Sequence, residues 1–155
     1  MRRLALLAAL ALAAPAFAQP TEMEGWVVIE TSKGYQELVD AVKAAAGPNK
    51  LGVVTEAGPT GAAASRGVEI PGNRVIGLFN NVYAVRILEL STNAMIEAPI
   101  RMYVTENADE TATLSYKTPS YVFAPYVAEA GADLEAAASE LDAIFATVAE
   151  QATAE

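Results

Sequence analysis

The sequence predicts an α+β domain of two layers, a mixed β-sheet packed by helices, in the order β-α-β-α-β-α-β-β-α. Three observations predict this class. Short β-branched runs alternate with segments whose apolar residues recur at helical spacing. Each of these helices has one apolar face, which needs a sheet or another helix to cover it. The last two strands are separated by a short turn, and such a hairpin favours a mixed sheet over a purely parallel one.

The first third of the domain is predicted to contain two strands and a helix. Residues 26–30 (WVVIE) are a β-branched and aromatic run typical of a strand. Thr31-Ser32 offers an N-cap for the helix that follows. The apolar residues on one face of this helix are Tyr35, Leu38, Val39, Val42 and Ala46. Residues 47–49 (GPN) end the helix, and residues 51–56 (LGVVTE) form the second strand.

The middle of the chain is predicted to add a short helix, a strand and a longer helix. Residues 58–67 contain three consecutive alanines, which favour a short helix, but also three glycines, which weaken it. Residues 74–79 (RVIGLF) form the third strand. Asn80 and Asn81 cap the next helix, whose inward-facing residues are expected to be Val82, Val85, Leu88 and Ile87.

The last third is predicted to be a hairpin, an irregular segment and a long helix. Residues 100–105 alternate between apolar and polar side chains, as in a strand with one buried face. Residues 107–109 form a turn, and residues 111–117 form the partner strand. Residues 118–127 are expected to be irregular, and residues 133–149 to be helical. The apolar stripe of this helix consists of Leu134, Ala138, Leu141, Ile144 or Phe145, and Val148.

The N-terminus has the three parts of a secretory signal peptide. Arg2 and Arg3 are basic, residues 4–14 are apolar, and residues 16–18 (AFA) form a small-x-small cleavage site. The apolar run is shorter than the roughly 20 residues of a transmembrane helix. We therefore expect residues 1–18 to be cleaved after Ala18, the mature protein to be periplasmic or secreted, and no membrane insertion after cleavage. Residues 19–25 are then a mobile arm, and residues 26–151 a single domain.

Composition excludes several classes of chemistry. The 155 residues include 10 Lys+Arg and 19 Asp+Glu, with no His and no Cys. No Ser-His-Asp triad, cysteine nucleophile, disulfide or thiolate or imidazole zinc site can therefore form. No cofactor and no metal site are expected, and the acidic balance argues against nucleic acid as a partner. Two carboxylates are enough for a glycosidase, so an enzyme is disfavoured but not excluded.

A strand end supplies the candidate ligand-binding residues. Asn80 and Asn81 follow the third strand at a helix start, where backbone N–H groups and the helix dipole attract anions. Arg74 and Arg101 lie near this point if their strands are neighbours. The alternative is ordinary capping by asparagine, with both arginines solvated.

A cluster of aromatic residues precedes the last helix. Its members are Tyr116, Tyr121, Phe123 and Tyr126. Aromatic rings with hydroxyl tips suit a binding rim or a subunit interface. The alternative is a loop that caps the core.

The segments from Trp26 to Lys117 resemble the family called domain of unknown function 302. The resemblance rests on residues 32–39 (SKGYQELV), 51–56 (LGVVTE), 71–80 (PGNRVIGLFN), 98–106 (APIRMYVTE) and 114–116 (LSY). Family members are expected to carry Gly-x-Cys-Asn-Pro after the third strand. Gly77 and Asn80 match this motif, whereas Phe79 and Asn81 replace its Cys and Pro, so no thiol-based role is available here. The resemblance implies a compact α+β domain that forms a homodimer, and it implies no activity.

The favoured interpretation is an exported, non-catalytic binding or interaction domain whose biochemical activity the sequence does not specify. Its partner would be a small molecule or an envelope protein. The alternatives are an accessory subunit of an envelope complex, and a hydrolase-type enzyme that uses carboxylates and Tyr or Arg side chains.

Overall fold

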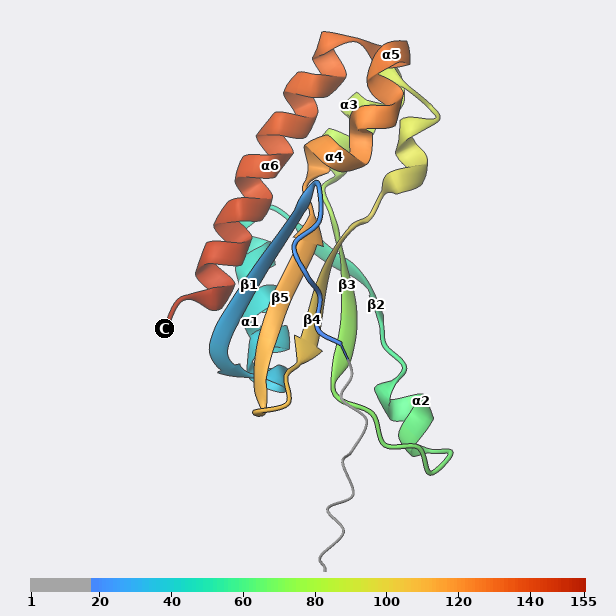
Figure 1. Cartoon of the computed structure of the whole chain (residues 1–155). Coiled ribbons are helices and arrows are strands. Elements are labelled where there is room, and N and C mark those ends of the chain that lie inside the picture. Colours follow the sequence, from blue (N-terminus) through green and yellow to red (C-terminus); the bar gives the residue numbers. More distant parts are fainter. Residues whose placement is uncertain (1–17) are drawn as a thin grey trace, which may run out of the picture.

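The computed structural model describes residues 18–155 and has one five-stranded sheet (Figure 1). The strands are β1 (Trp26–Gly34), β2 (Gly52–Ala57), β3 (Asn73–Phe79), β4 (Ile100–Glu106) and β5 (Thr111–Lys117). The main helices are α1 (Tyr35–Ala46), α3 (Asn81–Leu90) and α6 (Ala132–Thr153). The shorter helical segments are η1 (Gly47–Asn49), α2 (Thr60–Ala64), η2 (Ala94–Glu97), α4 (Pro119–Phe123), η3 (Ala124–Tyr126) and α5 (Val127–Ala130). The predicted signal peptide falls outside the described residues, except for Ala18.

The α+β class and the packing of helices on a sheet are confirmed, but the sheet is antiparallel throughout and not mixed. The strand order is β1-β5-β4-β3-β2, and every neighbouring pair runs antiparallel. The one β-α-β crossover, through α1, joins β1 to β2. Because these strands form opposite edges of the sheet, no two parallel strands become neighbours.

One face of the sheet, here called the covered face, packs against α1 and α6. In Figure 1, α1 lies behind the sheet and α6 runs alongside β1. The strands place Ile76, Met102, Val104 and Leu114 on this face, and none of these side chains has any exposed surface. The predicted apolar faces of α1 and α6 meet them, with Phe145 rather than Ile144 buried in the stripe of α6.

The opposite face, here called the open face, carries no helix layer. Alternation along the strands places Trp26, Val75, Arg101, Tyr103 and Lys117 on this side. Residues 19–25, expected to be a mobile arm, pass in front of this face in Figure 1. The Gln19 side chain fixes the arm there, since its Nε2 donates to the Glu106 carbonyl at 2.9 Å and its Oε1 accepts from Thr105 Oγ1 at 3.0 Å.

Three local predictions differ from the structure. β1 continues to Gly34, because residues 31–34 keep pairing with β5 across a register shift, so Thr31 and Ser32 do not cap α1. The segment after β5, expected to be irregular, forms α4, η3 and α5, and the Thr118 hydroxyl caps α4 by accepting from Tyr121 N.

The orientation of α3 is the third difference. Val82, Val85 and Leu88, expected to face inward, are 76%, 49% and 48% exposed. Ile87, also expected to face inward, is buried, and the rest of the inner side consists of Tyr83 and Leu90, which are half-buried. Both sides of α3 carry apolar residues. The side that packs includes Tyr83, whose hydroxyl makes that side look less apolar in the sequence than the exposed side. No helix within residues 18–155 is long and apolar enough to cross a membrane.

Candidate functional site

The structure does not gather the four predicted ligand-binding residues into one pocket. Arg74 and Arg101 lie on neighbouring strands but on opposite faces, since Arg74 pairs in register with Val104 and Arg101 with Gly77. Arg74 Nη1 forms an ion pair with Glu56 Oε2 at 2.8 Å beside the covered face. Arg101 is exposed on the open face.

Asn80 serves as the N-cap of α3. Its Oδ1 accepts hydrogen bonds from Val82 N at 2.8 Å and Tyr83 N at 3.2 Å. Its Nδ2 donates to the Lys50 carbonyl at 2.9 Å, which ties the start of α3 to the segment just before β2. Asn81 is exposed in the first turn of the same helix. Both polar atoms of the Asn80 side chain are thus already bonded within the protein.

The four predicted rim aromatics divide between the core and the periphery. Phe123 is buried, and the buried Tyr116 ring lies 5.9 Å from that of Phe145. Tyr121 is exposed and covers Gly25 of the arm, where φ is +73° and a β-carbon would lie 2.0 Å from the Tyr121 ring. Tyr126 donates its hydroxyl proton to Glu97 Oε1 at 2.7 Å. Of the four, Tyr116 also lines the groove described next.

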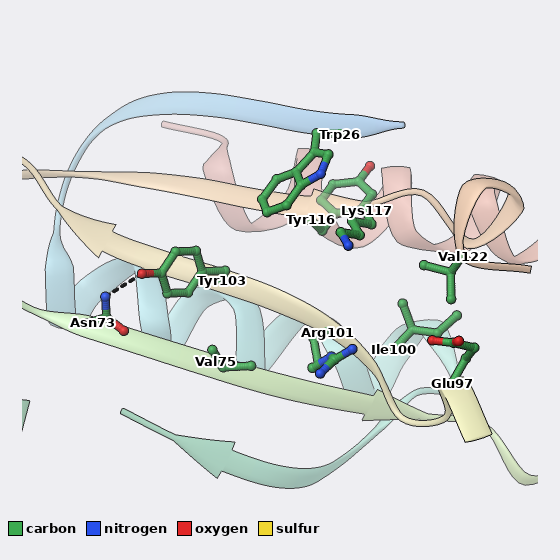
Figure 2. A pocket seen from close by; sticks show the side chains of 10 residues that line it. All are labelled: Trp26, Asn73, Val75, Glu97, Ile100, Arg101, Tyr103, Tyr116, Lys117 and Val122. Atoms are coloured by element: carbon green, nitrogen blue, oxygen red, sulfur yellow. Dashed lines mark hydrogen bonds between the residues drawn. The ribbon is translucent and has the colours of Figure 1, made fainter. Parts of the chain in front are cut away.

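A groove of about 440 Å³ crosses the open face (Figure 2). Its lining residues come from β1, β3, β4, β5, η2 and α4: Trp26, Asn73, Val75, Glu97, Ile100, Arg101, Tyr103, Tyr116, Lys117 and Val122. Figure 2 shows Trp26 and Lys117 along one side, with Val75 and Arg101 across from them. This volume lies within the roughly 300–1,000 Å³ of small-molecule sites.

Two cations in this groove lack carboxylate partners. Within residues 18–155, ion pairs form at Lys33, Lys43, Arg74 and Arg86, but none forms at Arg101 or Lys117. Lys117 Nζ lies 5.6 Å from the centre of the Trp26 ring, within the range of a cation–π contact. An acidic protein therefore presents unneutralised positive charge on the one sheet face that no helix covers.

Hydrogen bonds fix the two ends of the groove. At one end, Asn73 Nδ2 donates to the Tyr103 hydroxyl and orients its ring. At the other end, Glu97 accepts from Tyr126, and this bond raises the pKa of the Tyr126 hydroxyl. Burial, reinforced by the negative charges of Asp142 and Glu150, raises the pKa of Tyr116. The groove thus has a preset shape, which favours binding.

The lining chemistry suits binding of an anion better than acid–base catalysis. Glu97 is the single carboxylate among the lining residues, whereas hydrolysis of a glycoside needs two. Within residues 18–155, no group of three or more acidic side chains is placed to hold a metal ion. Arg101 and Lys117 are the groups that would contact a ligand's negative charge.

Sequence reasoning found Arg101 and Tyr116 but missed Trp26, Tyr103 and Lys117. The available signal was the alternation in β4, which places Arg101 and Tyr103 on the same face, opposite Met102. Lys117 and Trp26 join them only through the pairing of β1 with β5, in which these two residues are register partners.

Comparisons with known proteins agree with the fold. A search of curated proteins found no match. Among solved structures, the chain is similar to the crystal structure of uncharacterized conserved protein DUF302 from Bacillus stearothermophilus. The TM-score is 0.73 at 14% identity, over 84% of this chain and 99% of that one, so the likeness concerns the fold alone. Residues 27–151 match the family model "Domain of unknown function DUF302". Because this match covers most of the sequence, the chain belongs to the DUF302 family.

Proposed function

We propose that this protein is an exported, non-catalytic domain that binds a small organic anion with a flat apolar group in the open-face groove. The observation that carries the proposal is the presence of two cations without ion-pair partners, Arg101 and Lys117, beside the half-buried ring of Trp26 in one groove. A planar guanidinium binds carboxylate, phosphate or sulfonate groups through two parallel hydrogen bonds. Trp26 offers a surface on which an aromatic or other flat group stacks.

The single tryptophan makes this proposal directly testable. Trp26 is the only Trp in the chain, so tryptophan fluorescence reports on the surroundings of this one groove residue. The probe is 1-anilinonaphthalene-8-sulfonate, and the matched neutral probe is N-phenyl-1-naphthylamine, which lacks the sulfonate. We expect energy transfer from Trp26 to the anionic probe, and weaker binding of the neutral one.

Charge variants then identify the anion contacts. Arg101→Gln and Lys117→Gln should each weaken anionic-probe binding about ten-fold, as expected for the loss of one charge-assisted contact. Arg66→Gln is the control, because Arg66 is an exposed arginine outside the groove lining. Equal affinity of wild type and Arg101→Gln would overturn the proposal.

Export is the second part of the proposed function. The basic, apolar and small-x-small segments of residues 1–18 support it. N-terminal sequencing of the protein from its native host should begin at Gln19. A product that still starts at Met1 would contradict export while leaving the groove proposal intact.

A protein partner is the second candidate function, and the exposed side of α3 favours it. Val82, Val85 and Leu88 form an apolar stripe beside Ile96 of η2, which is 81% exposed. Large exposed apolar patches on soluble proteins mark interaction sites. We propose a second copy of this chain as the occupant, in line with the homodimer that the family resemblance implies.

Sedimentation velocity tests self-association. The wild type should sediment as a dimer, and Val85→Glu should shift it to monomer. Val68→Glu is the control, since Val68 is similarly exposed, at 50%, but lies in the loop before β3. A wild-type monomer at every accessible concentration would exclude the homodimer.

A further inference from the structure

The open-face groove shares lining residues with two neighbouring hollows. Two further hollows, of about 300 and 240 Å³, adjoin it on the side of the arm. Tyr103 lines all three cavities. Trp26 is shared with the 300 Å³ hollow, and Asn73 with the 240 Å³ hollow. Tyr103 therefore borders the groove and both hollows.

The 300 Å³ hollow, here called the arm compartment, has no charged side chain in its lining. Its residues are Ala18, Gln19, Pro20, Thr21, Met23, Trp26 and Tyr103. The arm that forms it is held at both ends, by the two hydrogen bonds of the Gln19 side chain and by the bond from Trp26 N to Met23 O at 2.9 Å. Cleavage after Ala18 would remove that lining residue and place the new α-ammonium of Gln19 at one end of the compartment, whereas Pro20, Thr21, Met23 and Trp26 would remain around the rest of it.

The 240 Å³ hollow, in contrast, has a charged residue in its lining. Its lining includes Glu106, whose carboxylate accepts a hydrogen bond from Gly72 N at 2.6 Å and so is fixed at that site. An apolar group that entered this hollow would remove a carboxylate from water, which is unfavourable. An apolar extension of a ligand therefore fits the arm compartment better.

We propose that the ligand is an amphiphilic anion with a long aliphatic tail. Its head group contacts Arg101 and Lys117, and its tail passes Tyr103 into the arm compartment, between Trp26 and Met23. This inference rests on the proposed function, because it assigns the ligand class of the same groove. Met23 supports it further, since its flexible thioether side chain is 61% exposed at the place where the tail would lie.

A homologous series of alkanoates tests the tail. Hexanoate to dodecanoate, each kept below its micelle concentration, compete with 1-anilinonaphthalene-8-sulfonate for the groove. Complete burial of one methylene strengthens binding about four-fold, so half-burial in an open groove gives about two-fold. From octanoate to dodecanoate we expect a gain on the order of ten-fold or more.

Two variants separate the tail from the head. Met23→Ser should flatten the dependence on chain length, whereas Val68→Ser, at an exposed valine of the loop before β3, should leave it unchanged. Arg101→Gln should weaken the binding of every alkanoate by the same factor, and the dependence of affinity on chain length should remain. If chain length has no effect, or if Met23→Ser retains the full gain, the tail assignment is wrong. If the sulfonate probe binds wild type and Arg101→Gln equally, the proposed function itself fails.

Discussion

The two faces of the sheet differ although they are built from the same strands. β4 contributes Met102 and Val104 to the covered face, where both are fully buried, and Arg101 and Tyr103 to the open face. The covered face meets two helices, and the cavity that Leu78, Ile100 and Phe145 line there is only about 30 Å³. The open face meets only the arm, and its groove is lined by cations and aromatic rings. The helix layer thus supplies stability, which leaves the open face available for binding.

Even the buried part of the open face is polar. Thr105, Thr113 and Ser115 are buried there, partly beneath the arm. The Thr113 hydroxyl donates to Asn107 Oδ1 at 2.9 Å, and that of Thr105 donates to Gln19. Ser115 Oγ has no hydrogen-bond partner among residues 18–155. A face optimised for packing alone would not bury hydroxyls in this way.

The largest expected loss of stability comes from a substitution in the core of the covered face. Leu114→Ala should destabilise the protein by roughly 3 kcal/mol, because it removes a fully buried side chain beneath α1 and α6 and leaves a cavity. Val75→Ala on the open face should lower the free energy of unfolding by less than about 1.5 kcal/mol, since Val75 is only half-buried. Urea unfolding of both variants measures the difference. Similar losses would mean that the open face also contributes a packed core.

The covered face was largely predictable from sequence, because its strands and helices follow simple periodicities. The alternation in residues 100–105 identified Ile100, Met102 and Val104, and the helical spacing from Tyr35 identified the inner side of α1. Periodicity failed for α3, which has apolar residues on two sides. A repeat shows which residues share a side of a helix, but not which side packs.

The groove could not be predicted in the same way, because strand order brings its residues together. Trp26 and Lys117 are 91 positions apart and become register partners only because β1 pairs with β5 at the sheet edge. Arg74 and Arg101 lie on adjacent strands, but the register of β3 and β4 places them on opposite faces. A shift of one residue in that register would have placed them on the same face.

The second largest loss of stability is expected at Asn80, between β3 and α3. Asn80→Ala should destabilise the protein by about 1–2 kcal/mol, since it removes an N-cap and the bond to the Lys50 carbonyl. Asn80→Asp keeps the cap but loses the donated hydrogen bond, so its loss should be smaller but measurable. Thermal unfolding distinguishes the two variants. The Asp variant should respond to the sulfonate probe as wild type does, because Asn80 lies outside the groove.

The third effect tests an ion-pair cluster beside the covered face. Hydrogen bonds from Lys43 and, more weakly, Arg74 hold the pKa of Glu56 below its ordinary value of 4.5, against the opposing effect of burial. Glu56→Gln should lower the free energy of unfolding by roughly 1 kcal/mol near neutral pH, since both partners are partly exposed and screened by solvent.

The same depressed pKa sets the pH dependence. Because the folded state binds the Glu56 proton more weakly than the unfolded state, the stabilisation is fully present above pH 4.5. It is lost as the pH falls through the lower, folded-state value. Urea titrations from pH 7 down to pH 3 should therefore show the wild-type advantage over Glu56→Gln disappearing below pH 4.5. An advantage that persisted at pH 3 would assign the effect to packing.

The smallest expected effect on stability comes from removing the charges of the open-face groove. A small effect is what we expect of residues that serve binding rather than folding. Arg101→Gln and Lys117→Gln should each change the free energy of unfolding by no more than about 0.5 kcal/mol, because both side chains are exposed and form no ion pair within residues 18–155.

Added ligand should reveal the difference between wild type and these variants, since a ligand that binds the native state alone stabilises it by about 2.7 kcal/mol at 100 times the dissociation constant. Thermal unfolding with the sulfonate probe should therefore raise the melting temperature of wild type and Arg66→Gln, and raise it less for the two groove variants. If either groove variant were destabilised by more than about 1 kcal/mol without ligand, its cation would support the fold, and the contrast between the two faces would fail at that residue.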